Sequence, residues 1–199
     1  MKNDDIINIK EIKEYALKED IPIMMDSGIE YLTSFIVKNN IKSVLEIGSA
    51  IGYSAIMMAL VNNNLKVTTI EKDKQRYLEA VKNIKKLKLE DRITIIFNDA
   101  LDVNIEEVYD LIFIDAAKGK NIDFFNKFKR NLNVDGYIIT DNINLHGFVD
   151  MKDEDIKSKN MRSLVRKIRE YITFLKENTE YTTRFIESGD GITVSRKSN

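Results

Sequence analysis

The stretch VLEIGSAIGYSAIM, residues 44–57, decides the fold. Its first part belongs to a mostly apolar run over residues 43–47, which suits a strand buried on both faces. The run breaks at Gly48 and Gly52, and an apolar helix follows through Leu60. Glycine lets the backbone approach a ligand closely, and a helix N-terminus offers N–H groups that have no partner. Strand, glycine turn and helix therefore predict a nucleotide-type binding corner.

The spacing of the glycines and Glu46 narrow the choice of ligand. The pattern is G-x-x-x-G, which differs from the G-x-G-x-x-G of dinucleotide-binding folds. A carboxylate at Glu46 would repel a pyrophosphate, but it suits a cationic or amine-bearing ligand. These features favour S-adenosylmethionine (SAM) over NAD, and an ordinary strand–helix turn is the alternative interpretation.

Composition bounds the class of protein. The chain has 199 residues, 43% hydrophobic and 32% charged, which fits a single soluble globular domain. The net charge of -1 gives no overall attraction for nucleic acid, so any RNA contact needs a local basic patch. The chain has no Cys and one His, which excludes thiol catalysis and a His-based metal triad within one chain. We find neither a signal-like segment nor a membrane-spanning apolar run, and we expect a cytoplasmic protein with no membrane contact.

Helical and strand periods alternate along the chain. Two helices are expected within residues 1–40, at 4–18 and to about residue 38, with Pro22 separating them. Met24 lies in the link between them, where core packing is the alternative to a ligand contact. Strands are expected at 43–47, 66–70, 92–97, 109–114 and 136–140, and further helices at 74–89, 124–132 and 155–176. A hairpin at 182–187 and 192–195 ends the chain. This order predicts an α/β fold with a mostly parallel sheet and an antiparallel C-terminal hairpin.

Polar residues follow the expected strands at the points where these end. Glu71 ends the second strand, where α/β nucleotide folds hold ribose hydroxyls. Asp99 follows the third strand and is a candidate for contact with an adenine, with capping of a turn as the alternative. Both side chains are therefore expected at the same crevice as the glycine corner.

Asp115 and the pair Asp141–Asn142 end two further strands, and these ends face one crevice in an open α/β sheet. Two carboxylates and one amide oxygen form a hard oxygen set suited to Mg²⁺. Lys118 follows Asp115 by three residues. Like charge and desolvation would lower the pKa of such a lysine and make it a general base, and a solvated lysine is the alternative. His146 follows in a loop, either at the mouth of the crevice or on the surface.

At this point the motifs resemble a known family. LEIGSAIGYSA, TIEKD, NDA, FIDAAKG and TDN occur in the order found in metal-dependent catechol and caffeoyl-CoA type O-methyltransferases. Within that group the chain is most similar to bacterial tRNA 5-hydroxyuridine methyltransferases, through IPIM, AIGYSA, DAAKG, RSLVRKIRE and the GDG hairpin. The resemblance implies one Rossmann-like SAM-dependent methyltransferase domain over residues 1–199. It also implies a seven-stranded sheet, N-terminal helices that cover the SAM site, and a homodimer.

The resemblance also implies roles for individual residues and a reaction. The metal ligands would be Asp115, Asp141 and Asn142, and the catalytic residue Lys118. The SAM contacts would be Met24, Glu46, Gly48, Ser54, Glu71, Asp99, Ala100 and Asp115. The cofactors would be SAM and Mg²⁺, with Mn²⁺ as an alternative ion. The implied reaction methylates 5-hydroxyuridine at the wobble position of a tRNA anticodon stem-loop, giving 5-methoxyuridine. The chain has no Trp, which counts against a flat catechol.

A basic helix face supplies a physical argument for RNA. Arg162, Arg166 and Arg169 recur at helical spacing and share one face, and Lys120 lies close to Lys118 in sequence. Together they could contact phosphates, although a charged helix face is often only solvated. Three other functions stay open: methylation of a small phenol, a nicotinamide-dependent dehydrogenase, and a non-catalytic RNA-binding module. The glycine spacing speaks against the dehydrogenase, and the module would not need the expected metal ligands and lysine together.

Overall fold

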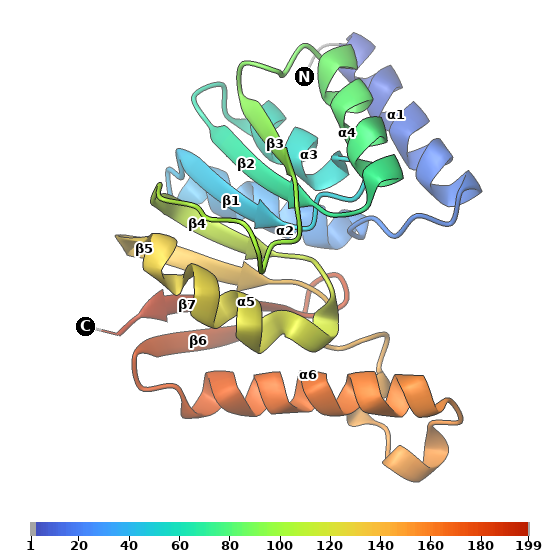
Figure 1. Cartoon of the computed structure of the whole chain (residues 1–199), viewed down its shortest axis with the longest axis vertical. Coiled ribbons are helices and arrows are strands. Elements are labelled where there is room, and N and C mark those ends of the chain that lie inside the picture. Colours follow the sequence, from blue (N-terminus) through green and yellow to red (C-terminus); the bar gives the residue numbers. More distant parts are fainter. Residues whose placement is uncertain (1–2, 199) are drawn as a thin grey trace.

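The computed structural model describes residues 3–198, which contain one seven-stranded sheet of order β3-β2-β1-β4-β5-β7-β6 (Figure 1). The strands are β1 (Ser43–Ile47), β2 (Lys66–Glu71), β3 (Ile93–Phe97), β4 (Tyr109–Ile114), β5 (Leu132–Thr140), β6 (Tyr181–Ile186) and β7 (Ile192–Lys197). The first five pair in parallel, and β7 pairs antiparallel with β5 and with β6. The predicted mostly parallel sheet with an antiparallel C-terminal hairpin is confirmed.

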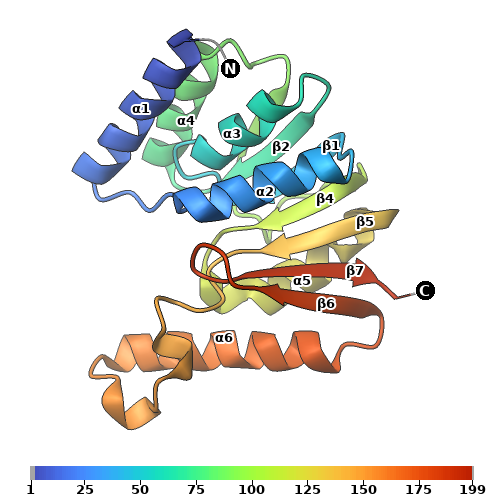
Figure 2. The same cartoon turned by 180° about the vertical axis from the view of Figure 1, so that it is seen from behind.

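Helices cover both faces of this sheet, as the opposite views in Figures 1 and 2 show. They are α1 (Asn3–Lys18), α2 (Asp26–Lys38), α3 (Tyr53–Val61), α4 (Lys74–Lys86), α5 (Asn121–Phe128) and α6 (Lys159–Glu177). One apolar core joins side chains of α1, α2, α3 and α4 to one sheet face, and a second joins α5 and α6 to the other. Because both faces are covered, the central strands are apolar almost throughout.

Strand β4 shows how the alternation of side chains serves both cores. Leu111 and Phe113 lie in the core beneath α2 and α3, whereas Ile112 and Ile114 lie in the core beneath α5 and α6. Successive side chains of a strand point to opposite faces, so this unbroken apolar run divides evenly between the two cores. The carboxyl ends of the parallel strands then meet at one edge of the sheet, which is where the polar strand-end residues gather.

The region before β5 differs from the prediction. The helix expected at 124–132 is α5, at Asn121–Phe128, and the strand expected from Gly136 begins at Leu132. The side-chain amide of Asn131 donates to the carbonyls of Ile105, at 2.8 Å, and Glu107, at 2.9 Å. These bonds anchor the chain just before Leu132 pairs with β4. Gly136 therefore lies inside the strand and does not start it.

Helix α6 begins at Lys159 and not near residue 155 as predicted. The hydroxyl of Ser158 accepts a hydrogen bond from the backbone N–H of Met161, at 3.3 Å, and so caps the helix at this point. The acidic residues before it, Asp153–Asp155, form a separate 3-10 turn. Helix α4 likewise ends at Lys86, earlier than the predicted residue 89. None of the helices in residues 3–198 is long and apolar enough to cross a membrane.

Candidate active site

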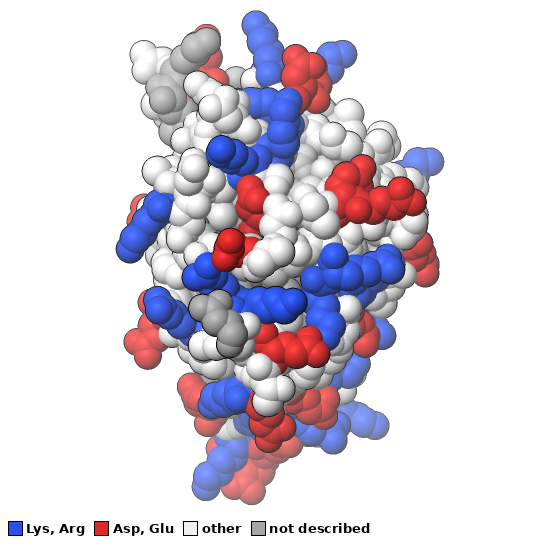
Figure 3. Space-filling view, turned by 90° about the vertical axis from the view of Figure 1, so that its left-hand side faces the viewer, with Lys and Arg blue, Asp and Glu red and all other residues white. Residues whose placement is uncertain are grey.

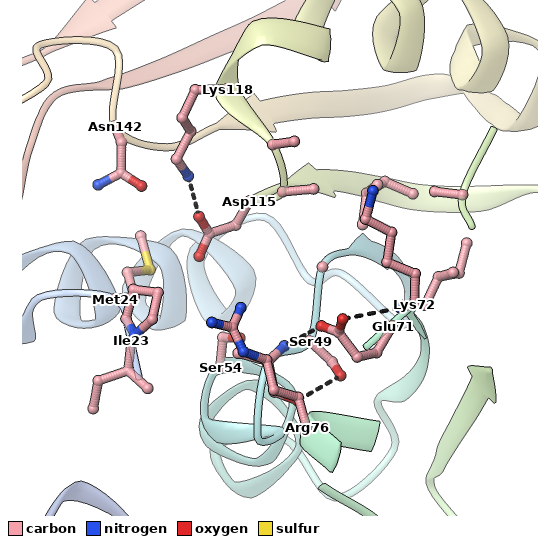
Figure 4. A pocket seen from close by; sticks show the side chains of 18 of the residues that line it. Ile23, Met24, Ser49, Ser54, Glu71, Lys72, Arg76, Asp115, Lys118 and Asn142 are labelled. Atoms are coloured by element: carbon pink, nitrogen blue, oxygen red, sulfur yellow. Dashed lines mark hydrogen bonds and ion pairs between the residues drawn. The ribbon is translucent and has the colours of Figure 1, made fainter. Parts of the chain in front are cut away.

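A pocket of about 400 Å³ opens at the carboxyl edge of the sheet, and Figure 4 shows it from close by. Its walls come from the α1–α2 link, the glycine corner, and the residues that follow β2, β3, β4 and β5. The predicted residues among its walls are Met24, Gly48, Ser54, Glu71, Asp99, Ala100, Asp115, Lys118 and Asn142. Segments far apart in the sequence therefore meet at the edge where the strand pattern placed them.

The glycine corner comes close to the backbone after β4. Gly48 has a φ of +95°, and a Cβ atom added to it would lie 2.5 Å from the carbonyl oxygen of Asp115. A residue with a side chain would therefore have to push the two segments apart. Gly52 stands at the start of α3, where no side chain caps the helix. The N-terminal N–H groups of α3 consequently remain available to a ligand.

Glu71 fixes the corner as well as lining the pocket. One carboxylate oxygen accepts the backbone N–H of Ala50, at 2.8 Å, and the other accepts those of Lys72, at 2.9 Å, and Asp73, at 2.8 Å. An ionised carboxylate has about four acceptor sites, so capacity remains for a hydroxyl of a ligand. The sequence predicted the ribose contact but not this link between the end of β2 and the glycine turn.

Glu46 does not line the pocket. Its side chain is fully buried and accepts hydrogen bonds from the hydroxyls of Ser54 and Thr69, both at 2.5 Å. Burial raises the pKa of Glu46 to about 7; the two hydroxyls lower it and the charges of Asp115 and Glu71 raise it. The structure therefore places this carboxylate beneath Ser54 and not at the pocket surface that the sequence analysis assumed.

Asp99 combines the two roles that the sequence left open. One carboxylate oxygen caps a turn by accepting the backbone N–H of Leu101, at 2.9 Å, and the other lies 3.3 Å from the ammonium of Lys72. The Leu101 N–H is the main reason why the pKa of Asp99 lies below its ordinary value. Because the residue also borders the pocket, the cap holds it where a base could contact it.

The segment that follows β4 carries an ion pair at the pocket. The ammonium of Lys118 lies 2.5 Å from a carboxylate oxygen of Asp115, and less than a fifth of either side chain is exposed, at 19% and 17%. Figure 4 shows the ammonium of the lysine pointing at the carboxylate of the aspartate. The predicted base and a predicted metal ligand are therefore partners in this structure.

Asp141 is buried beside this pair. It is 1% exposed, and its Oδ1 atom has no hydrogen-bond partner among the described residues. Burial, and then the charge of Asp115, raise the pKa of this carboxyl above its ordinary value. An orphaned carboxylate oxygen next to a second carboxylate suits a bound cation, because a positive charge would satisfy both.

The remaining predicted ligand is Asn142, which has a φ of +59° and borders the pocket. Residues 3–198 contain no cluster of three or more His, Asp and Glu side chains that could hold a metal ion. A cation site here therefore needs the amide oxygen of Asn142 in addition to the two carboxylates. Two carboxylates and one amide match the oxygen ligands that Mg²⁺ and Mn²⁺ accept, so the residues fit the expected ion.

Two residues of this region were not predicted. Arg76 lies in the first turn of α4, and its guanidinium is directed into the pocket in Figure 4. Asp190, in the turn between β6 and β7, is 4% exposed and contacts the loop after β5. The GDG turn can be recognised in the sequence. Its contact with the loop after β5 cannot, because Asn142 lies 48 positions before Asp190. His146, left open above, does border the pocket.

The residues predicted to contact RNA divide into two groups. Arg162 donates to the carbonyls of Ile156 and Lys157, and Arg169 binds the carbonyls of Val149 and Met151 and the carboxylate of Asp153. These two arginines therefore hold the segment before α6. Arg166 is exposed, and Lys120 is half exposed with Asp123 at 3.2 Å. Lys167, also exposed, packs over Gly119 beside Lys118.

The chain is similar to known proteins in sequence and in fold. The model of the O-methyltransferase family matches residues 2–198. An Arabidopsis thaliana protein provisionally named as a caffeoyl-CoA O-methyltransferase is 30% identical over 192 residues, covering 94% of this chain and 82% of its own length. A Staphylococcus aureus structure, named provisionally in the same way, is 36% identical with a TM-score of 0.90, covering 96% of this chain and 92% of that one.

A third comparison concerns the fold. The O-methyltransferase of Bacillus cereus, solved in complex with S-adenosylhomocysteine, is 22% identical with a TM-score of 0.82, and the match covers 96% of this chain and 90% of that one. At this identity the likeness extends to the architecture, including the arrangement of strands around the pocket. The match of the family model over nearly the whole sequence decides the assignment, and the chain belongs to the O-methyltransferase family.

Proposed function

We propose that this SAM-dependent O-methyltransferase methylates the 5-hydroxyl of 5-hydroxyuridine in tRNA, with a divalent cation held by Asp115, Asp141 and Asn142. The observation that carries the proposal is that Asp115, Lys118 and Asn142 line one part of the pocket, with the buried carboxyl of Asp141 close enough to Asp115 for the two charges to interact. The orphaned oxygen of Asp141 supports a cation at this wall. Such a cation would favour the ionised form of a hydroxyl that it contacts.

The chemistry of the acceptor fits these residues. In 5-hydroxyuridine the O5 hydroxyl and the O4 carbonyl are neighbours, so the ring offers two adjacent oxygens, as a catechol does. Lys118 stands at the wall where these oxygens would lie, paired with Asp115. Once its own proton has passed to solvent, the neutral amine would accept the hydroxyl proton and become an ammonium again. The fixed corner at Gly48 and Glu71 orients the donor, so that much of the acceleration comes from positioning.

Access of RNA to the pocket requires a base outside a duplex. An anticodon loop is single-stranded, so its base can turn into the pocket without melting paired strands. Positively charged side chains would contact the phosphates next to this base; they belong to Arg166 and Lys167 on α6 and to Lys120. Figure 3 shows another basic band, flanked by acidic side chains, on the side from which the parallel strands start. That band faces away from the pocket and plays no part in the proposal.

A small phenolic acceptor is the second candidate. The observation in its favour is the name of the relatives, which are described as caffeoyl-CoA O-methyltransferases. The same cation ligands and the same lysine would serve a catechol-like ring, whereas phosphate contacts on α6 would not be needed. The two candidates therefore differ in whether the arginine and lysine side chains of α6 contribute to catalysis.

The test uses purified enzyme with SAM and Mg²⁺ on two kinds of substrate: tRNA carrying 5-hydroxyuridine, and a panel of catechols. We expect 5-methoxyuridine in the tRNA, detected by mass spectrometry of nucleosides. The variant Arg166→Ala/Lys167→Ala should bind tRNA more weakly and with a shallower salt dependence, while methylation of a catechol stays unchanged. Lys85→Ala, an exposed lysine of α4, is the matched control. Efficient turnover of a catechol without methylation of tRNA would replace the tRNA assignment with the second candidate.

A further inference from the structure

The turn between β6 and β7, residues 188–191, carries a buried carboxylate that faces the loop after β5. One carboxylate oxygen of Asp190 accepts a hydrogen bond from the backbone N–H of His146, at 2.6 Å. The other accepts a hydrogen bond from the side-chain amide of Asn142, at 3.4 Å. Asp190 is 4% exposed and is not itself among the walls of the pocket. It therefore acts on the site through Asn142 and the loop.

The contact fixes which end of the Asn142 amide faces the pocket. The nitrogen donates to Asp190, so the oxygen points the other way. Figure 4 shows the oxygen of Asn142 on the side of Asp115 and the nitrogen on the far side. A cation accepts the oxygen of an amide as a ligand and is repelled by its N–H groups. We propose that Asp190 is a positioning residue, which turns the amide oxygen of Asn142 toward the cation; this inference rests on the proposed function.

The backbone of the loop supports this assignment. Asn142, Leu145 and His146 all have positive φ angles, of 59°, 47° and 54°. Such a run of residues other than glycine is strained and needs outside contacts to hold it. The turn supplies them, because Ile143 N–H donates to the Gly191 carbonyl at 3.1 Å and Asn144 N–H to the Asp190 carbonyl at 2.9 Å. These two bonds use backbone atoms, so a change of the Asp190 side chain leaves them in place.

The same turn also contacts α2, and this contact provides a control. The hydroxyl of Ser188 donates to the carbonyl of Ser27, at 2.9 Å, and Gly189 N–H donates to the hydroxyl of Ser27, at 3.2 Å. Gly189 packs against Gly28, since a Cβ atom on it would lie 3.2 Å from the Cα of Gly28. Ser188→Ala therefore weakens the anchorage of the turn without touching Asn142.

The test is the substitution Asp190→Asn. The introduced amide has one acceptor, which the N–H of His146 engages, and its nitrogen then faces the nitrogen of Asn142. Two donors cannot share a hydrogen bond, so the Asn142 amide should turn over and present its nitrogen to the cation. We expect Mn²⁺, followed by electron paramagnetic resonance, to bind about 10–100-fold more weakly, the usual effect of losing such a supporting partner. Binding of S-adenosylhomocysteine, measured by calorimetry, should change by less than about twofold, because the lost partner supports only a ligand of the cation. Asp190→Ala introduces no competing donor and should weaken Mn²⁺ binding less.

The wild-type protein and the control separate the possible failures. If Asp190→Asn binds Mn²⁺ as tightly as the wild type, Asp190 does not orient the ligand and the inference is wrong. If Ser188→Ala weakens Mn²⁺ binding as much, the effect belongs to the anchorage of the whole turn, and the inference is equally wrong. If the wild type binds no Mn²⁺ at all, the metal part of the proposed function fails first.

Discussion

Glu46→Gln should stabilise the protein at alkaline pH. The carboxylate is fully buried, and burial raises its pKa to about 7 from the ordinary value of 4.5. Glutamine keeps the shape of the side chain and can still pair with both hydroxyls, because its oxygen accepts from one and its nitrogen donates to the other. The substitution therefore removes the buried charge while leaving the hydrogen bonds of Ser54 and Thr69 satisfied.

The size of the effect follows from proton linkage. The folded protein binds the Glu46 proton more tightly than the unfolded chain, so stability is lost as the pH rises from 4.5 through about 7. At about 1.4 kcal/mol per pKa unit, the loss is about 1 kcal/mol at pH 5 and about 3 kcal/mol at pH 8. Glutamine does not titrate, so the advantage of the variant should grow between these two pH values by about 2 kcal/mol.

Urea unfolding at pH 5, 6, 7 and 8, followed by circular dichroism, measures this difference in the free energy of unfolding. Thr69→Val is a useful companion, because it removes one of the two hydroxyls that favour the ionised form. It should destabilise the protein more at pH 8 than at pH 5. A stability difference between Glu46→Gln and the wild type that is constant over this pH range would refute the reasoning, since it would mean that Glu46 binds no more protons in the folded protein than in the unfolded chain.

Three further predictions concern the pocket. Gly48→Ala should weaken S-adenosylhomocysteine binding in calorimetry by about tenfold or more, because the added Cβ would lie 2.5 Å from the Asp115 carbonyl oxygen. Unchanged affinity would show that the corner is not the cofactor site. Neither the wild type nor this variant should bind NAD. Excess EDTA should abolish turnover by the wild type, and added Mg²⁺ should restore it. Asp141→Ala should be inactive in both conditions, with an unchanged circular dichroism spectrum. Full activity of the wild type in EDTA would exclude a catalytic cation. Lys118→Ala should lower kcat by about 10²–10⁴-fold with little change in S-adenosylhomocysteine affinity; a wild-type pH–rate profile in this variant would show that no lysine is needed to ionise the acceptor.

The sequence predicted those parts of the molecule that depend on local patterns. Strand ends followed by Glu71, Asp99, Asp115 and Asp141 were enough to locate one edge of a parallel sheet. Boundaries failed where a long-range contact decided them, as at Asn131, whose amide binds two carbonyls more than twenty positions away. Competition between local and tertiary preferences is resolved only when the chain is packed.

Side-chain direction was the second limit. Glu46 has the right position in the motif, but its carboxylate points toward Thr69 on the neighbouring strand and not toward the pocket. Arg162 and Arg169 share a helix face as predicted, yet the segment before α6 occupies their donors. Asp190 could not be assigned from its turn alone, because its partner Asn142 lies 48 positions earlier. In each case the missing information is which groups meet across the fold.

The position of β7 has a consequence for how the protein is made. This strand lies between β5 and β6, so the apolar edge of β5 stays unpaired until the last residues of the hairpin have been synthesised. An exposed apolar edge invites pairing with other chains, and pairing over long sequence separations is slow. The turn that leads into β7 also joins Ser188 to Ser27, 161 positions apart. On the ribosome, the glycine corner can therefore form early, whereas the loop that carries Asn142 is fixed only at the end, and an incomplete chain is both inactive and prone to aggregate.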